Sequence, residues 1–237
     1  MDPQRAQSFG AAADAYALAR PTYPVEAVTF CLPADARRVL DLGAGTGKLT
    51  SVLLDLGLDV VAVEPDDAMR AHVDRRATAL AGSAENVPVE DGSVDAVLVG
   101  QAWHWFSPQA AIASVVRVLR PGGTLGLLWN VIDDSSGWPL AVAEIMELED
   151  RLSLVPQKQT RPYDEPDSFS PWSRQLFAHT QSADADLVVA NMASRSVVIL
   201  RDQPSRLELL GRVRDAVPAG TFEIPWVTDA WVATTPA

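Results

Sequence analysis

Basic residues and cysteine are scarce in this chain of 237 residues. It contains two lysines, Lys48 and Lys158, no run of basic residues, and a net charge of −12. A protein that grips DNA or RNA neutralises phosphates with a basic surface, so the sequence predicts no nucleic-acid partner. The one cysteine, Cys31, excludes an intramolecular disulfide, which suits a reducing compartment.

Long apolar runs are also missing. No stretch approaches the roughly 20 apolar residues that cross a bilayer, and the N-terminal segment lacks the apolar core of a signal peptide. We therefore expect a cytoplasmic protein with no membrane partner, either a monomer or a homodimer. Hydrophobic residues make up 48% of the chain, a globular composition, and the length suits a single domain, residues 1–237.

Strands and helices alternate over the first half of the sequence. Apolar runs predict strands that end near Leu40, Val63, Ala81, Val99 and Trp129, with helices between them that include a short one at 69–76. This order implies parallel strands joined by right-handed crossovers. The second half is predicted to contain a helix at 139–152, an irregular insertion at 153–175, a strand near 176–182, helices within 186–198 and 205–213, and a last strand within 222–234. We interpret 153–175, which contains four prolines, as a lid or substrate insertion.

Residues 39–48, VLDLGAGTGK, form a glycine-rich turn after an apolar run. A P-loop requires G-x-x-x-x-G-K-[ST], and Leu42 and Leu49 occupy two of its required positions. A dinucleotide loop requires G-x-G-x-x-G, but its third glycine position is Lys48. A nicotinamide-dependent oxidoreductase is thus a minor alternative interpretation of this turn. Another is a tight strand-to-helix connection that binds no ligand.

Acidic and polar residues follow the predicted strands at corresponding places. Asp41 lies at the end of the first strand, and Glu64 ends the second, where a carboxylate can accept hydrogen bonds from ribose hydroxyls. The segments 82–85 and 100–106 follow the next two strands. Open α/β sheets bind ligands at this edge, so these segments are predicted to form one site.

These segments together resemble the class I S-adenosylmethionine-dependent methyltransferases. The matching stretches are VLDLGAGTGKLT, VAVEPDDAMR, AGSAENVPVEDGSVDAVLVGQAWHWF and VLRPGG. The opening pattern Phe9…Tyr16…Arg20-Pro21…Tyr23-Pro24 looks like the N-terminal cap of the small-molecule branch that includes trans-aconitate methyltransferases. The resemblance covers residues 9 to about 130 well and the remainder loosely.

The resemblance implies a Rossmann-like α/β fold, with a mainly parallel seven-stranded sheet, helices on both faces and an antiparallel last strand. It implies an N-terminal cap at 1–30, a cofactor-binding core at 31–135, and S-adenosyl-L-methionine as cofactor. Glu64 would hold the ribose, and Arg20 would lie near the carboxylate of the cofactor. The implied cofactor-binding residues are Tyr16, Arg20, Asp41, Gly43, Ala44, Gly45, Thr46, Gly47, Glu64, Pro65, Met69, Ser83, Ala84, Glu85, Gln101 and Ala102.

The aromatic stretch Trp103-His104-Trp105-Phe106 is interpreted as a wall of the site, with an aromatic plug of the following helix as the alternative. Aromatic faces attract a sulfonium cation. His104 is a candidate catalytic base or acceptor contact, because imidazole titrates near neutral pH, and Trp105 is a second candidate.

No metal is expected. Asn130, Asp133 and Asp134 are interpreted as a polar loop, since an oxygen-binding ion needs more ligands. The predicted activity is transfer of a methyl group from S-adenosylmethionine to an oxygen or nitrogen of a small molecule. The alternative outside enzymes is a cofactor-binding protein that has lost catalysis.

Overall fold

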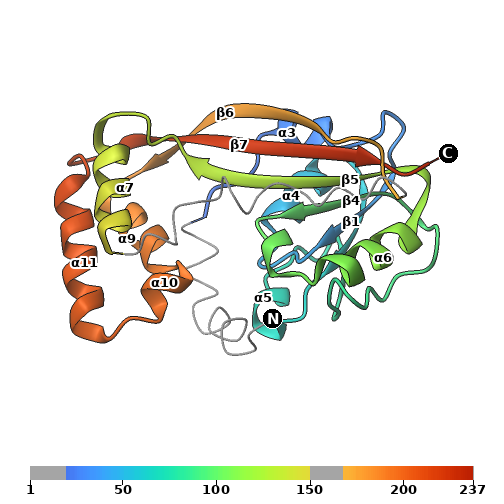
Figure 1. Ribbon diagram of the computed structural model, residues 1–237, viewed down its shortest axis with the longest axis horizontal. Helices are drawn as coiled ribbons and strands as arrows, with labels where there is room; N and C mark the ends of the chain where they lie inside the picture. The colour runs from blue at the N-terminus through green and yellow to red at the C-terminus, as the bar shows by residue number, and fades with distance from the viewer. Residues whose placement is uncertain (1–19, 150–167, 237) are drawn as a thin grey trace.

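The computed structural model describes residues 20–149 and 168–236, which form a seven-stranded sheet in the order β3-β2-β1-β4-β5-β7-β6 (Figure 1). The strands are β1 (Arg38–Leu42), β2 (Asp59–Val63), β3 (Thr78–Leu80), β4 (Val94–Gly100), β5 (Leu119–Ile132), β6 (Ser173–Ala183) and β7 (Phe222–Thr234). The pairs from β3 to β5 are parallel, and β7 runs antiparallel to both β5 and β6. The expected fold class, with its antiparallel last strand, is confirmed.

Helices cover both faces of the parallel part of the sheet. Successive side chains of a strand point to opposite faces, so Val39 joins a different buried cluster from Leu40. One face packs against α6 (Pro108–Val118), and the other against α3 (Val25–Phe30) and α4 (Lys48–Asp55). α3 lies within residues 20–30, the described part of the expected N-terminal cap. Its residues Ala27 and Val28 are fully buried.

The strand register brings several loops to one edge of the sheet. Leu42 at the end of β1 pairs with Val63 at the end of β2, and Asp41 pairs with Leu98 near the end of β4. The turns after β1, β2 and β4 therefore leave the sheet side by side, as the sequence predicted.

A helical unit lies beyond the carboxyl ends of β1 and β4 (Figure 1). It consists of α7 (Gly137–Glu149), α9 (Ala185–Ala193), α10 (Ser196–Ile199) and α11 (Gln203–Ala216). Its apolar side chains, such as Met146, Met192 and Val213, pack with Ile224 and Trp226 of β7. The long strands β5, β6 and β7 thus carry this unit to a place opposite the loop edge.

Three predicted boundaries differ from the structure. The helix expected at 69–76 is α5, Asp67–Arg70, because Asp74 accepts the backbone N–H of Arg76 and forms a turn instead. β5 begins at Leu119 and includes the Pro-Gly-Gly sequence that was expected to lie before it. Residues 153–167 of the expected insertion lie outside the described residues, and β6 begins at Ser173, within its last part. None of the described helices is long and apolar enough to cross a bilayer.

Candidate active site

The glycine turn connects β1 to α4 at the loop edge. Gly43, Gly45 and Gly47 have φ values of 72°, 56° and 82°, a left-handed conformation that residues with a Cβ atom rarely adopt. The N–H groups of Gly43 and Ala44 donate to the carbonyl oxygen of Val63 at 2.9 and 3.1 Å. These bonds attach the turn to the end of β2, so the three glycines are required by the backbone path.

The first and middle glycines of the turn differ in the space around them. A Cβ atom on Gly43 would lie 2.7 Å from Cβ of Ala102, whereas one on Gly45 would meet only Sδ of Met69, at 4.0 Å. Beside Gly45, the hydroxyl oxygen of Thr46 is buried and has no hydrogen-bond partner in the described chain. A buried polar atom is normally paired. An open glycine face beside an unpaired hydroxyl therefore fits a polar ligand that contacts the turn.

Glu64 follows β2, and its carboxylate reaches the glycine turn. Oε2 accepts the N–H of Gly45 at 2.9 Å, and Oε1 accepts the N–H of Asp66 at 2.9 Å. Burial raises the pKa of Glu64, and these two hydrogen bonds oppose that increase. Each carboxylate oxygen has a further lone pair, so the group can also accept hydrogen bonds from ribose hydroxyls.

Asp41 lies in β1 beneath the turn and is 1% exposed. Its Oδ2 accepts the hydroxyl of Thr50 at 2.6 Å. Burial raises the pKa of Asp41 to about 7, the Thr50 hydrogen bonds lower it in part, and the charge of Glu64 adds to the increase. The charge of Asp41 therefore changes within the physiological pH range.

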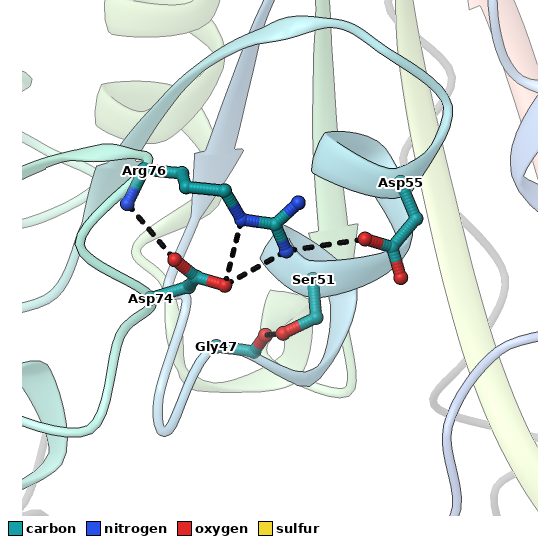
Figure 2. Close-up of polar contacts among 5 residues, drawn as sticks. All are labelled: Gly47, Ser51, Asp55, Asp74 and Arg76. Atoms are coloured by element: carbon teal, nitrogen blue, oxygen red, sulfur yellow. Dashed lines mark hydrogen bonds and ion pairs between the residues drawn. The ribbon is translucent and has the colours of Figure 1, made fainter.

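The segment after β2 carries Met69, whose side chain is buried beside the glycine turn, and Val73 packs against the last glycine. Figure 2 shows how this segment is attached: Nη2 of Arg76 donates to Asp74 at 2.8 Å and to Asp55 of α4 at 3.1 Å. These exposed ion pairs contribute little to stability, and they connect the segment to α4. Pro65, at its start, is exposed.

Ser83, Ala84 and Glu85 follow β3. Ala84 is buried, and Oε1 of Glu85 accepts the N–H of Ser107 at the start of α6, at 2.9 Å. Burial raises the pKa of Glu85, but hydrogen bonds, first that from Ser107, outweigh it and leave the pKa below its usual value. The carboxylate of Glu85 thus holds α6 against the segment predicted to border the adenine.

Gln101 follows β4 with a φ of 58°, unusual for a residue with a side chain. Its N–H donates to the carbonyl oxygen of Leu128 at 2.9 Å, and Nε2 donates to that of Asn130 at 2.7 Å. Asn130 in turn donates from Nδ2 to the carbonyl oxygen of Thr22. A strained residue held by its surroundings is often found at a functional site, and this one directs the chain into the aromatic segment.

The aromatic segment forms the short helix η2 (Trp103–Trp105). Trp103 is buried and contacts Phe106 edge to face, with ring centroids 5.7 Å apart. The rings of His104 and Trp105 are 4.7 Å apart. His104 is exposed, and partial desolvation, together with the charge of Arg20, lowers its pKa. The imidazole is therefore neutral at pH 7, and it is a weaker base than a free imidazole.

Arg20 lies close enough to His104 and to Arg195 for its positive charge to lower the pKa of both. Arg195 lies between α9 and α10. No sequence motif distinguishes Arg195 from the other arginines. Its place near Arg20 depends on the path of the C-terminal helices. Tyr16, the other predicted residue of the cap, lies outside the described residues.

Asn130 belongs to β5 rather than to a loop after it, where it accepts the hydroxyl of Thr228 at 2.6 Å. Asp133 accepts the N–H of Ser135. Within residues 20–149 and 168–236, no group of three or more His, Cys, Asp or Glu side chains is placed to hold a metal ion.

Comparisons with known proteins identify the family. A methyltransferase domain model matches residues 40–127. The chain is 46% identical over 216 residues to an uncharacterized methyltransferase of Mycobacterium tuberculosis, covering 87% of this chain and 84% of the relative.

Two solved structures share the fold. A proposed type II methyltransferase of Anaeromyxobacter dehalogenans has a TM-score of 0.68 at 21% identity and covers 92% of this chain and 99% of its own. A phosphoethanolamine N-methyltransferase of Haemonchus contortus, solved with phosphomonomethylethanolamine and S-adenosylhomocysteine, has a TM-score of 0.57 at 15% identity, with coverages of 99% and 59%. With its fold and its relatives, the chain belongs to the class I S-adenosylmethionine-dependent methyltransferases, enzymes whose cofactor is S-adenosylmethionine.

Proposed function

We propose that this enzyme methylates an oxygen or nitrogen atom of a small-molecule acceptor, at a site formed by the glycine turn, Glu64 and η2. The net charge of −12 supports a small acceptor over a nucleic acid. The helical unit, which lies opposite the loop edge, also favours a small acceptor. The relation to trans-aconitate methyltransferases remains a prediction.

The position of Glu64 is the observation that carries this proposal. Its carboxylate accepts the backbone N–H groups of Gly45 and Asp66 at 2.9 Å each. It is therefore held beside the glycine turn and keeps lone pairs that can accept further hydrogen bonds. In this position it would accept hydrogen bonds from the two ribose hydroxyls of the cofactor. Thr46 would donate its unpaired hydroxyl to the cofactor, and the open face of Gly45 would let the backbone approach it.

The remaining predicted contacts follow from burial and from neighbouring charge. Met69 and Ala84, both buried, would border the adenine. Arg20 would lie near the carboxylate of the cofactor, and Tyr16 would help to close the cap over it.

The cofactor supplies a methyl group on a sulfonium, which is already a good leaving group. The protein therefore mainly orients the acceptor and excludes water. A ring nitrogen of His104, neutral at pH 7, would take the proton of a hydroxyl or amine acceptor. The faces of Trp105 and Phe106 would favour positive charge beside them.

Calorimetric titration with S-adenosylhomocysteine tests the cofactor site. Glu64→Gln is expected to weaken binding about 10-fold or more, because the ribose hydroxyls lose a charged acceptor. Glu90→Gln, a change at an exposed carboxylate, should leave binding unchanged. Equal affinities in the two variants, or tight NAD binding without any response to S-adenosylhomocysteine, would refute the assignment.

A labelled-methyl assay tests the acceptor class. Small carboxylates, phenols and amines are offered with labelled S-adenosylmethionine, and transfer to at least one class is expected. Incorporation into nucleic acid or protein alone would contradict a small-molecule acceptor.

A further inference from the structure

Arg195 is a partly buried cation, and no described carboxylate forms an ion pair with it. Its Nε atom is buried and has no hydrogen-bond partner among the described residues. Two acidic residues at the start of α9 have other partners: Asp184 caps α9 by accepting the N–H of Leu187, and Asp186 pairs with Arg214. The Nε–H of Arg195 is therefore available to a ligand.

Arg195 lies between α9 and α10 of the helical unit. In Figure 1, α9 and α10 lie beyond the carboxyl ends of β1 and β4, on the side of the glycine turn. The charge of Arg20 acts on both Arg195 and His104, so Arg20 lies near each of them. His104 lies two residues after Ala102, which packs against Gly43 of the turn.

The charge of Arg20 makes an anion beside Arg195 favourable. The Nε–H of Arg195 is buried without an acceptor, which is costly until a ligand supplies one. Burial, together with this charge, lowers the pKa of Arg195 to about 10, so the guanidinium is still charged at pH 7. The chain contains 31 acidic residues, yet none of those described is paired with Arg195.

We propose that Arg195 forms the acceptor-binding subsite, and that the acceptor carries an anionic group, a carboxylate or phosphate. The planar guanidinium binds such groups with two parallel hydrogen bonds. This inference rests on the proposed methyltransferase function. It adds that the helical unit selects the acceptor by charge while the turn and Glu64 hold the cofactor.

Inorganic phosphate, titrated into the protein loaded with S-adenosylhomocysteine, tests the subsite. Sodium chloride at equal ionic strength serves as the control for screening. Wild-type protein is expected to bind phosphate saturably. Arg195→Gln should weaken that binding at least about 10-fold, and Arg195→Lys, which keeps the charge, should weaken it less. Arg75→Gln, which removes an exposed arginine, should have no effect.

The affinity for S-adenosylhomocysteine and the thermal midpoint complete the test. The affinity is expected to be preserved in Arg195→Gln, and the midpoint should stay equal or rise because the repulsion between Arg195 and Arg20 is removed. Phosphate binding that is absent, or equal in wild type and Arg195→Gln, would overturn the subsite and leave the cofactor site intact. A parallel loss of S-adenosylhomocysteine affinity would assign Arg195 to the cofactor, and a lower midpoint would assign it to the fold. Wild-type protein that does not bind S-adenosylhomocysteine would overturn the proposed function itself.

Discussion

Asp41 should make the stability of the cofactor-free protein depend on pH. It is 1% exposed, and burial raises its pKa from 3.8 to about 7. Between about pH 4 and pH 7 the folded protein therefore holds one proton that the unfolded chain has lost. The folded state is favoured when more protons are available, so stability from this group falls as pH rises through that range and is constant above it.

The size of the effect follows from the shift. A change of roughly three pKa units, at about 1.4 kcal/mol per unit, gives about 4 kcal/mol lost between pH 4 and pH 7. Asparagine has nearly the same shape and does not titrate. As pH rises, the unfolding free energy of Asp41→Asn should therefore fall less than that of wild type. The difference between the two decreases should approach about 4 kcal/mol between pH 4 and pH 8.

Urea unfolding at pH 4, 5, 6, 7 and 8 measures this difference. Other titrating groups are present in both proteins, so the difference between the two profiles reports Asp41 together with its electrostatic coupling to Glu64. A constant cost from the new amide shifts the whole profile without changing its slope. Asp35→Asn, at an exposed position, should run parallel to wild type. Parallel profiles for wild type and Asp41→Asn would refute the reasoning.

Three further predictions concern the site. Gly43→Ala should lower the unfolding free energy by about 1–3 kcal/mol, because of its positive φ and the overlap with Ala102. Gly57→Ala, which has a positive φ but open space, should cost about 1 kcal/mol, and equal losses in thermal or urea unfolding would contradict the contact. Thr46→Val should leave stability unchanged or higher and weaken S-adenosylhomocysteine binding a few-fold; unchanged affinity in calorimetry would remove Thr46 from the site. His104→Gln should reduce kcat by about 100-fold or more and change cofactor affinity little, whereas equal losses would make His104 a cofactor contact.

The cofactor side of the site was largely predictable from local sequence. The glycine turn, Glu64 and the segments after the third and fourth strands each follow an apolar run, and parallel strands place their carboxyl ends at one edge. The structure places these residues at that edge, while their binding roles stay predictions. Sequence patterns did not show that Glu64 contacts Gly45 or that Gln101 has a positive φ, because both depend on side-chain packing.

Periodicity and turn chemistry predicted the alternating fold and the loops that meet at one edge of the sheet, since both arise from short-range rules of backbone geometry, while the resemblance to a family supplied the methyl donor. The tertiary structure alone decided what faces that edge. Arg195 is separated from Arg20 by most of the chain, and only the long strands β5, β7 and β6 and the packing of α9 and α11 bring the two arginines together. A charge interaction between residues so distant in sequence has no local pattern, and for that reason the acceptor side could be inferred only from the folded chain.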